Sequence, residues 1–337
     1  MKIREKIKIV FMGGDLIGCS VLRHILRQRN TKVVLTVGCY HDNGAVIEPK
    51  EWNASLTRVA LNKSLNYLQP KSPRNQQFID DLMRLDRPDL IITAGYDQIL
   101  DSEILKIPRI GTINIHFSPL PKNRGYIPFV WSILSDQVAG VTLHWVNEHI
   151  NGGDIIAQQS IPIGNSDTSY SIYMKLSKLG INLFKKFFPK ILEGKAPRRQ
   201  QNESAATYHA AGYPYQRYIN WNESSEQIDR VIRALTFPGF DGARTFQQVD
   251  ICILHPVEIV APLDCDGYPA GTIVSFDDAG IVVKTGDGGL LIKKIKFPST
   301  ELAYSANKLR SLFGLDVGDN FQSFENLSKE GKLSLII

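Results

Sequence analysis

Apolar positions change their spacing repeatedly along the first half of the chain, and each change predicts a new element. Short apolar runs are typical of buried strands, and they occupy residues 6–12, 33–39, 89–94, 111–116 and 140–145. Segments between or after these runs carry apolar residues at helical spacing, at 16–29, 78–85 and 168–193. Strands and helices in this order favour an α/β fold with a doubly wound, mainly parallel sheet, in which ligands bind at the C-terminal ends of strands.

The pattern changes beyond about residue 200. Residues 201–215 are polar and rich in small side chains, which predicts a linker after a first domain over residues 1–200. One helix is then predicted at 225–234. Four short strands separated by glycine-rich turns are predicted at 249–254, 272–276, 281–285 and 290–297. Such strands favour a smaller, open β-barrel of the OB-like kind, here over residues 216–337.

Composition narrows the class of protein only a little. With 337 residues, 43% hydrophobic and 22% charged, the chain reads as an ordinary globular protein, and a net charge of +5 fits a solvated surface better than a nucleic-acid footprint. No apolar run is long enough for a membrane span, and the charged N-terminal residues lead straight into a strand, so no signal peptide is expected. The cysteines are scattered, which favours reduced thiols and a cytoplasmic location. They are Cys19, Cys39, Cys252 and Cys265.

Several familiar chemistries are not supported. The first turn, at residues 13–18, lacks the spaced glycines of a dinucleotide-binding loop, and no acidic residue clearly ends the second strand. Neither a nucleophile elbow nor a Walker loop occurs. His116, His144, His149 and Asp154 have no recognised metal-ligand spacing, so no metal site is expected.

The most informative feature is a carboxamide two positions before an imidazole on one predicted strand. Side chains at i and i+2 of a strand share a face, so Asn114 and His116 point the same way near the C-terminal end of their strand. An amide donor stabilises a developing oxyanion, and an imidazole exchanges protons near neutral pH. This pair therefore favours acyl transfer. The alternative for Asn114 is a structural residue that satisfies the backbone at a strand end.

The motifs around the pair resemble those of the folate-dependent formyltransferase family, which includes methionyl-tRNA formyltransferases and sugar-nucleotide N-formyltransferases. They are Asn-x-His at 114–116, Ser-Pro-Leu-Pro at 118–121, Arg-Gly at 124–125, Gly-Val-Thr at 140–142 and Asn-Gly-Gly-Asp at 151–154. Segments at 218–221, 232–243, 269–273 and 284–292 extend the resemblance into the predicted barrel.

The resemblance implies a reaction and a co-substrate. A primary amine would attack the formyl carbon of N10-formyltetrahydrofolate. Asn114 would donate a hydrogen bond to the resulting oxyanion, and His116 would stabilise it and move protons.

One position departs from the family pattern. The resemblance places an aspartate, the third catalytic group, where this chain has Asn151, which carries no charge and accepts no proton. Three accounts remain open: an aspartate replaced to inactivate the enzyme, transfer of the anionic role to Asp154, or a protein with altered or no catalysis.

The resemblance also implies a folate site. It is formed by the loop after the strand at 89–94 and by the motifs at 118–121, 124–125 and 151–154. Tyr96 and Leu100 are equally consistent with packing. The implied folate-binding residues are Tyr96, Ile99, Leu100, Ser118, Leu120, Gly125 and Gly153.

The acceptor amine is the least determined element. The loop at 39–56 has no Lys/Arg cluster of the kind that transfer-RNA formyltransferases carry, and this favours a small amine, in particular a nucleotide-linked amino sugar. Four lysines of the predicted barrel give modest support to transfer RNA instead: Lys284, Lys293, Lys294 and Lys296. Other amines, folate hydrolysis, a non-catalytic folate-binding protein and association into a homodimer stay open.

Overall fold

The computed structural model describes residues 5–40, 42, 52–85, 87–135, 138–260, 267–323 and 326–327. The chain divides into two compact units. The first comprises Met1–Pro128, Val138–Pro162 and Tyr173–Ala210, and the second comprises Phe129–Gln137, Ile163–Ile172 and Ala211–Ile337. Among the described residues, no helix has both the length and the apolarity needed to span a membrane.

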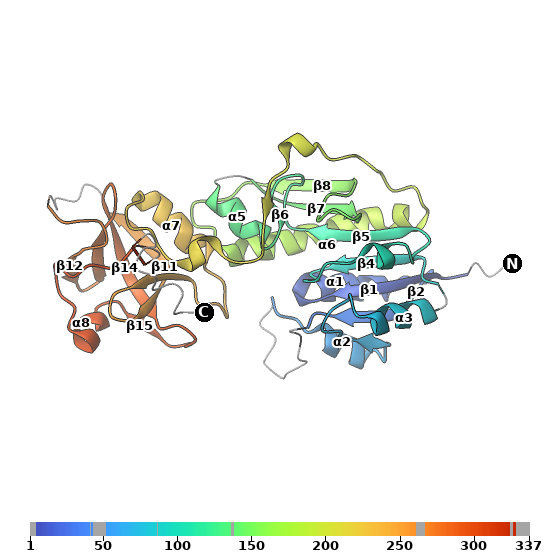
Figure 1. Ribbon diagram of the computed structural model, residues 1–337, viewed down its shortest axis with the longest axis horizontal. Coiled ribbons are helices and arrows are strands. Elements are labelled where there is room, and N and C mark those ends of the chain that lie inside the picture. The colour runs from blue at the N-terminus through green and yellow to red at the C-terminus, as the bar shows by residue number, and fades with distance from the viewer. Residues whose placement is uncertain are drawn as a thin grey trace. The chain divides into compact units, whose positions relative to one another are not determined.

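The first unit is built on a seven-stranded sheet with the strand order β3-β2-β1-β4-β5-β7-β8 (Figure 1). Neighbouring strands from β3 to β5 are parallel, whereas β7 is antiparallel to β5 and β8 is antiparallel to β7. The strands are β1 (Ile7–Gly13), β2 (Thr31–Gly38), β3 (Tyr67–Leu68), β4 (Leu90–Ala94), β5 (Gly111–His116), β7 (Ala139–Trp145) and β8 (Ile155–Ile161). The predicted mainly parallel, doubly wound sheet is confirmed.

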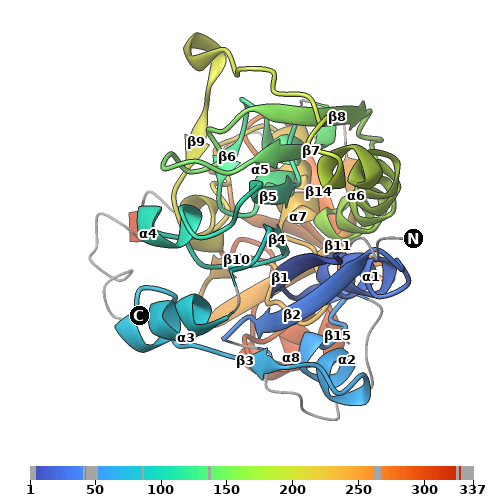
Figure 2. The ribbon, with the colours of Figure 1, turned by 90° about the vertical axis from the view of Figure 1, so that its right-hand side faces the viewer.

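Helices cover both faces of this sheet. Figure 2 shows α1 (Asp15–Ile25) and α6 (Ser169–Leu192) on one face, and α3 (Gln76–Arg84) and α4 (Ser102–Leu105) on the other. Strand residues that alternate along β1 and β2 pack with α3 and α4 in one buried cluster. Its members are Val10, Met12, Leu35, Val37, Phe78, Ile79, Leu82, Ile91 and Ile104.

Short polar side chains set where some of the helices begin. The Asn75 side chain accepts a hydrogen bond from the Gln77 amide at the start of α3, and Ser55 does the same for Arg58 at α2 (Leu56–Asn62). Such caps satisfy donors that a helix start leaves free.

A segment predicted as linker forms part of the first unit. The predicted linker spans 201–215, and the compact first unit extends to Ala210. In this segment η1 (Glu203–Ala205) is followed by β9 (Tyr208–His209), which pairs in parallel with β6 (Arg124–Gly125). A two-residue strand in a polar stretch has no hydrophobic period, so only its distant partner reveals it.

The second unit contains an antiparallel sheet in the order β10-β11-β14-β13-β12, with β15 also paired to β14. Its strands are β10 (Ala243–Phe246), β11 (Asp250–Val260), β12 (Ile273–Asp277), β13 (Gly280–Lys284), β14 (Gly289–Lys296) and β15 (Ala303–Ser305). The remaining helical segments are α5 (Pro128–Leu134), η2 (Pro214–Arg217), α7 (Ser225–Ala234) and α8 (Lys308–Phe313). The buried Trp221 indole stacks on Phe321, with ring centroids 5.9 Å apart. A separate antiparallel C-terminal domain is confirmed, and its OB-like character stays a prediction.

Candidate active site

The carboxamide of Asn114 lies in a row of polar side chains across three neighbouring strands. Thr93 on β4 and His144 on β7 are the register partners of Asn114 on β5. The Thr93 hydroxyl donates to Asn114 Oδ1 at 2.8 Å, and Asn114 Nδ2 lies 3.2 Å from His144 Nε2. Cross-strand neighbours on one face of a sheet are close enough for such contacts. The three strands therefore fix which end of the amide is the donor.

His144 is a buried, neutral imidazole with a defined tautomer. Its Nδ1 lies 2.7 Å from the Trp145 carbonyl oxygen, which only accepts, so Nδ1 carries the proton. Burial lowers the pKa of His144 to about 3, and the neighbouring His116 adds to this effect. The unprotonated Nε2 therefore accepts from Asn114 Nδ2. This holds one amide hydrogen of Asn114 in place.

His116 is also buried and neutral, but it has a different partner. Its Nε2 donates to the Asn123 carbonyl oxygen at 3.0 Å, which leaves the lone pair on Nδ1. Burial lowers the pKa of His116 to about 4. The rings of His116 and His144 lie 6.5 Å apart and are perpendicular. His116 can thus accept a proton at Nδ1 near neutral pH, but it carries no positive charge there to offer an oxyanion.

Asn151 meets Asn114 from the turn between β7 and β8. Its side-chain Oδ1 accepts from Asn114 Nδ2 at 3.5 Å, a long hydrogen bond. The backbone of Asn151 has φ 53°, a left-handed conformation that asparagine and aspartate tolerate better than most residues. The structure therefore brings Asn114, His144 and Asn151 together in one hydrogen-bonded group.

Asp154 stands apart from this group. Its main-chain oxygen accepts from the Trp145 amide, and its side chain is half-buried. Within the part of the chain that the structure describes, its carboxylate makes no hydrogen bond to Asn114 or His116. An anionic role for Asp154 beside His116 thus stays a prediction.

The residues predicted to hold folate after β4 differ in their surroundings. Tyr96 and Leu100 pack against the buried cluster shared by the sheet, α3 and α4, whereas Ile99 is exposed. Burial raises the pKa of the Tyr96 hydroxyl. That hydroxyl has no hydrogen-bond partner among the described residues. Both Tyr96 and Leu100 therefore have a packing role, and folate binding by these three residues stays a prediction.

The other predicted folate residues shape the loops around β5. Ser118 is fully buried and donates to the Lys122 carbonyl oxygen at 2.7 Å. Leu120 is held at both main-chain polar groups, because its amide donates to Thr142 Oγ1 and its carbonyl accepts from Gln158. These contacts fold the Ser-Pro-Leu-Pro segment back onto β7 and β8.

Two glycines are required by close backbone approaches. Gly125 has φ 98°, and a Cβ there would lie 2.0 Å from the His209 carbonyl oxygen. A Cβ at Gly153 would lie 2.0 Å from the Trp145 carbonyl oxygen. No side chain fits at either position. Both glycines thus shape the site through the backbone, and direct contact with folate stays a prediction.

Sequence reasoning missed the partners that orient the pair. The sequence pattern brings in His144 only through the question of a metal site. Among the described residues, no group of three or more His, Cys, Asp or Glu could hold a metal ion. The register of an antiparallel β5–β7 pair would have placed His144 opposite Asn114. No comparable signal points to Asn123, whose contact with His116 depends on the fold of a loop.

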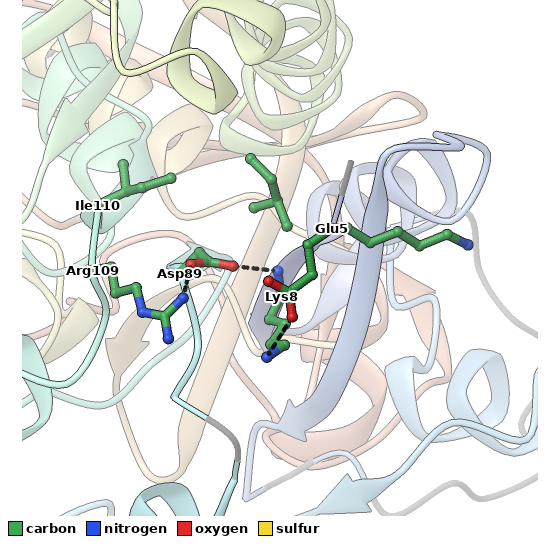
Figure 3. Close-up of a pocket in the computed structure, with 7 residues that line it drawn as sticks. Glu5, Lys8, Asp89, Arg109 and Ile110 are labelled. Atoms are coloured by element: carbon green, nitrogen blue, oxygen red, sulfur yellow. Dashed lines mark hydrogen bonds and ion pairs between the residues drawn. The ribbon is translucent and has the colours of Figure 1, made fainter. Parts of the chain in front are cut away.

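A hollow of about 180 Å³ lies at the other end of the sheet (Figure 3). It lies beside the starts of β1, β4 and β5. Ion pairs join Lys8 to Glu5 and Arg109 to Asp89 in its lining. Ligands of doubly wound sheets bind at the carboxyl ends of the strands, where Asn114 and His116 lie, so this hollow is not assigned to the reaction.

Comparison with known proteins identifies the family. Residues 7–187 match the formyl transferase family, and residues 214–311 match the formyl transferase C-terminal domain. The methionyl-tRNA formyltransferase of Mesoplasma florum is 30% identical over 321 residues, covering 94% of this chain and 100% of the relative. That of Clostridium tetani is 30% identical over 304 residues, covering 90% of this chain and 96% of the relative.

Solved structures of sugar formyltransferases share the fold. WlaRD, a sugar 3N-formyl transferase crystallised with dTDP and 5-N-formyl-THF, superposes with a TM-score of 0.67 at 22% identity, covering 88% of this chain and 100% of that chain. The N-formyltransferase of Helicobacter canadensis, in complex with folinic acid and dTDP-3-aminofucose, gives 0.67 at 22% identity, covering 85% and 98%. The family matches, the full-length relatives and the shared fold lead to one conclusion: the chain belongs to the folate-dependent formyltransferase family.

Proposed function

We propose that this formyltransferase moves the formyl group of N10-formyltetrahydrofolate to the primary amine of a nucleotide-linked amino sugar. Folate as donor is supported by the structural neighbours, which were solved with 5-N-formyl-THF, folinic acid or tetrahydrofolic acid. The oriented amide of Asn114, beside a neutral imidazole, is the observation that supports acyl transfer at this edge of the sheet.

The residues of the site support the following steps of formyl transfer. The amine nitrogen attacks the formyl carbon, and the formyl oxygen becomes an oxyanion. Because His144 holds one hydrogen of Asn114 Nδ2, the oxyanion accepts the other one in place of Asn151 Oδ1, whose hydrogen bond is long at 3.5 Å. His116 Nδ1 takes a proton from the amine and returns it to N10 of the folate, as the bond from N10 to the formyl carbon breaks. Asn151 gives up its hydrogen bond from Asn114 in this step, and its amide takes no proton.

The charge of the loop at 39–56 favours a small acceptor over transfer RNA. The segment 39–56 holds one lysine, Lys50, and the three carboxylates Asp42, Glu48 and Glu51. Binding of a polyanion depends on several coordinated Lys or Arg contacts with phosphates, and this segment offers no such cluster.

Two of the three lysines of β14 already have acidic partners, which leaves the exposed Lys294 as the third. Lys293 forms an ion pair with Glu258, and Lys296 lies 3.6 Å from Asp241 and donates to the Phe240 carbonyl oxygen. A lysine already paired to a carboxylate gives up that partner when it binds a phosphate. One structural neighbour was solved with dTDP-3-aminofucose. A nucleotide-linked amino sugar of this kind is a small anionic molecule, as the charge of the loop at 39–56 favours.

Transfer RNA is the second candidate, because the full-length relatives at 30% identity are methionyl-tRNA formyltransferases. The test incubates the protein with N10-formyltetrahydrofolate and either dTDP-linked amino sugars or methionyl initiator tRNA, and detects formylated product by mass spectrometry. Formylation of a sugar nucleotide alone supports the proposal. Formylation of the tRNA alone, with a steep decrease at higher salt, would overturn it.

A further inference from the structure

Gln201 connects a segment far along the chain to the turn that carries Asn151. Its Nε2 donates to the main-chain oxygens of Asn151 and Gly153, both at 2.7 Å. Both hydrogens of one carboxamide are thus used on a single turn. Because Asn151 has φ 53°, this turn holds a sparsely populated backbone conformation that needs support from its surroundings.

A buried arginine fixes the orientation of the Gln201 amide. Arg124 is 8% exposed, and its Nη2 donates to Gln201 Oε1 at 2.8 Å. The same guanidinium binds both carboxylate oxygens of Glu203, at 2.7 and 2.8 Å. If the Gln201 amide were rotated, its nitrogen would face the cation and its oxygen would face two carbonyls. The arginine therefore directs the donor end toward the Asn151 turn.

The other end of the same segment holds the partner of His116. Asn123 donates its main-chain amide to Thr207 Oγ1 at 2.8 Å, and Asn123 Oδ1 accepts from His209 Nε2 at 3.0 Å. The main chain at residues 207–209 adds two bonds, from the amides of Arg124 and Tyr126 to the carbonyls of Thr207 and His209. The Asn123 carbonyl held in this way is the group that keeps the proton of His116 on Nε2.

We propose that three side chains of residues 201–209, a segment here called the strap, position the reacting groups for formyl transfer. In the strap, Gln201 fixes the Asn151 turn, while Thr207 and His209 fix Asn123 and thereby the tautomer of His116. None of these three strap side chains needs to touch a substrate. The strap thus couples the two loops that face the reacting atoms, and it does so whichever amine is the acceptor.

The test uses variants that remove one anchor each. Gln201→Met removes both donors at similar size, and Gln201→Glu removes them while keeping an acceptor for Arg124. Thr207→Val removes the hydroxyl that holds Asn123, and Thr207→Ser restores a hydroxyl. Asn202→Ala is the matched control, because its side chain lies in the strap but is bonded only to Ser204 among the described residues.

Two measurements separate positioning from mere folding. Nitrogen-15 NMR of labelled histidines reads the His116 tautomer in the ligand-free protein and needs no acceptor, so its outcome is independent of the proposed amino-sugar function. Steady-state formyl transfer, in an Asn151→Asp background if the parent chain is too slow, separates kcat from KM.

We expect Gln201→Met and Gln201→Glu to lower kcat at least tenfold, with less than a twofold change in KM for the folate. Thr207→Val should give a mixture of His116 tautomers and a similar loss of kcat, and Thr207→Ser should recover both. Asn202→Ala should change neither. If His116 keeps a single Nε2–H tautomer in Thr207→Val, or if Asn202→Ala loses as much kcat as both Gln201 variants, the strap is structural only and the proposal is wrong. Gln201→Glu retains the test if Gln201→Met does not fold.

Discussion

Asn151→Asp places one negative charge where the side chain of residue 151 meets the Asn114 carboxamide. The substitution keeps the size of the side chain, and aspartate tolerates the left-handed backbone found there, φ 53°. The oxygen that accepts from Asn114 Nδ2 at 3.5 Å becomes part of a carboxylate. The change therefore alters charge and proton-accepting capacity while the shape of the turn stays as it is.

The expected magnitude follows from the burial of His116. Burial lowers the pKa of His116 to about 4, and a carboxylate at residue 151 would contact Asn114, which shares a strand face with His116. The variant should therefore raise the pKa of His116, toward the pH at which a general base is most effective. General-base assistance is typically worth about 100- to 10,000-fold in all, and His116 already supplies part of it, so strengthening this base should raise kcat by roughly tenfold or more.

Two measurements check this expectation. The pH dependence of kcat should show an acidic limb near pH 4 in the parent chain and a limb displaced to higher pH in the variant. An NMR titration of His116 should show the same displacement in the absence of substrate. Asn147→Asp is the control, because Asn147 is exposed on the same connection between β7 and β8 and bonds the His149 amide rather than Asn114.

Two outcomes would reject the reasoning. An unchanged kcat together with an unmoved His116 titration means that residue 151 does not limit proton transfer. An equal gain in Asn147→Asp means that the added charge acts on the protein as a whole and not on the reacting groups. A gain in Asn151→Asp alone supports the account in which the asparagine impairs an otherwise assembled site.

Further predictions concern the groups around that site. Asn114→Ala should lower kcat by about 100- to 1,000-fold through loss of an oxyanion donor. Thr93→Val removes only the hydrogen bond to the Asn114 amide oxygen and should lower kcat by roughly tenfold. Assays at saturating folate compare the kcat of the two variants. The pKa of His116 is lowered to about 4 and that of His144 to about 3, so the unfolded chain takes up protons first as the pH falls below about 6.5. These two imidazoles should make the free energy of unfolding about 4 kcal/mol smaller at pH 5 than at pH 7.5, and an equal value in urea at both pH values would contradict the burial effect. Gly125→Ala should lower the free energy of unfolding by roughly 3 kcal/mol, because its Cβ would lie 2.0 Å from a carbonyl oxygen of β9, and chemical denaturation measures this.

The buried strands and amphipathic helices could be predicted from the sequence because their signal is local. The predicted strand at 111–116 coincides with β5, and the predicted helices at 168–193 and 225–234 correspond to α6 and α7 within one residue. Apolar spacing over such lengths reports burial directly. The short strands β3, β6 and β9 could not be found in this way, since two residues define no period and their pairing depends on segments distant in the chain.

In the candidate site, too, the local features could be predicted from the sequence and the long-range contacts could not. That Asn114 and His116 share a strand face follows from their spacing, and the Asn-Gly-Gly-Asp motif indicated that residue 151 would lie near them. The partners that orient the pair could not be predicted locally, because Gln201 lies 50 residues from Asn151 and Thr207 lies 84 residues from Asn123. A polar stretch with no period predicts a linker, and the local pattern does not show that its Gln201 and Thr207 side chains bind the loops of the site.

The contacts of the site separate two requirements of formyl transfer. Orientation of the oxyanion donor is met without any charge, because Thr93 and the neutral His144 hold the two ends of the Asn114 amide. Within the described part of the chain, the site has no comparably strong group to remove the amine proton. The buried imidazole of His116, with a pKa of about 4, is a weak base, and residue 151 is an amide. An anion at residue 151 would strengthen that base, and Thr93 and His144 would still hold the Asn114 amide in its orientation. Binding of a neutral analogue of the tetrahedral intermediate should therefore be nearly equal in the parent chain and in Asn151→Asp, while the rate of transfer differs, since the donor is already in place and only the base is weak.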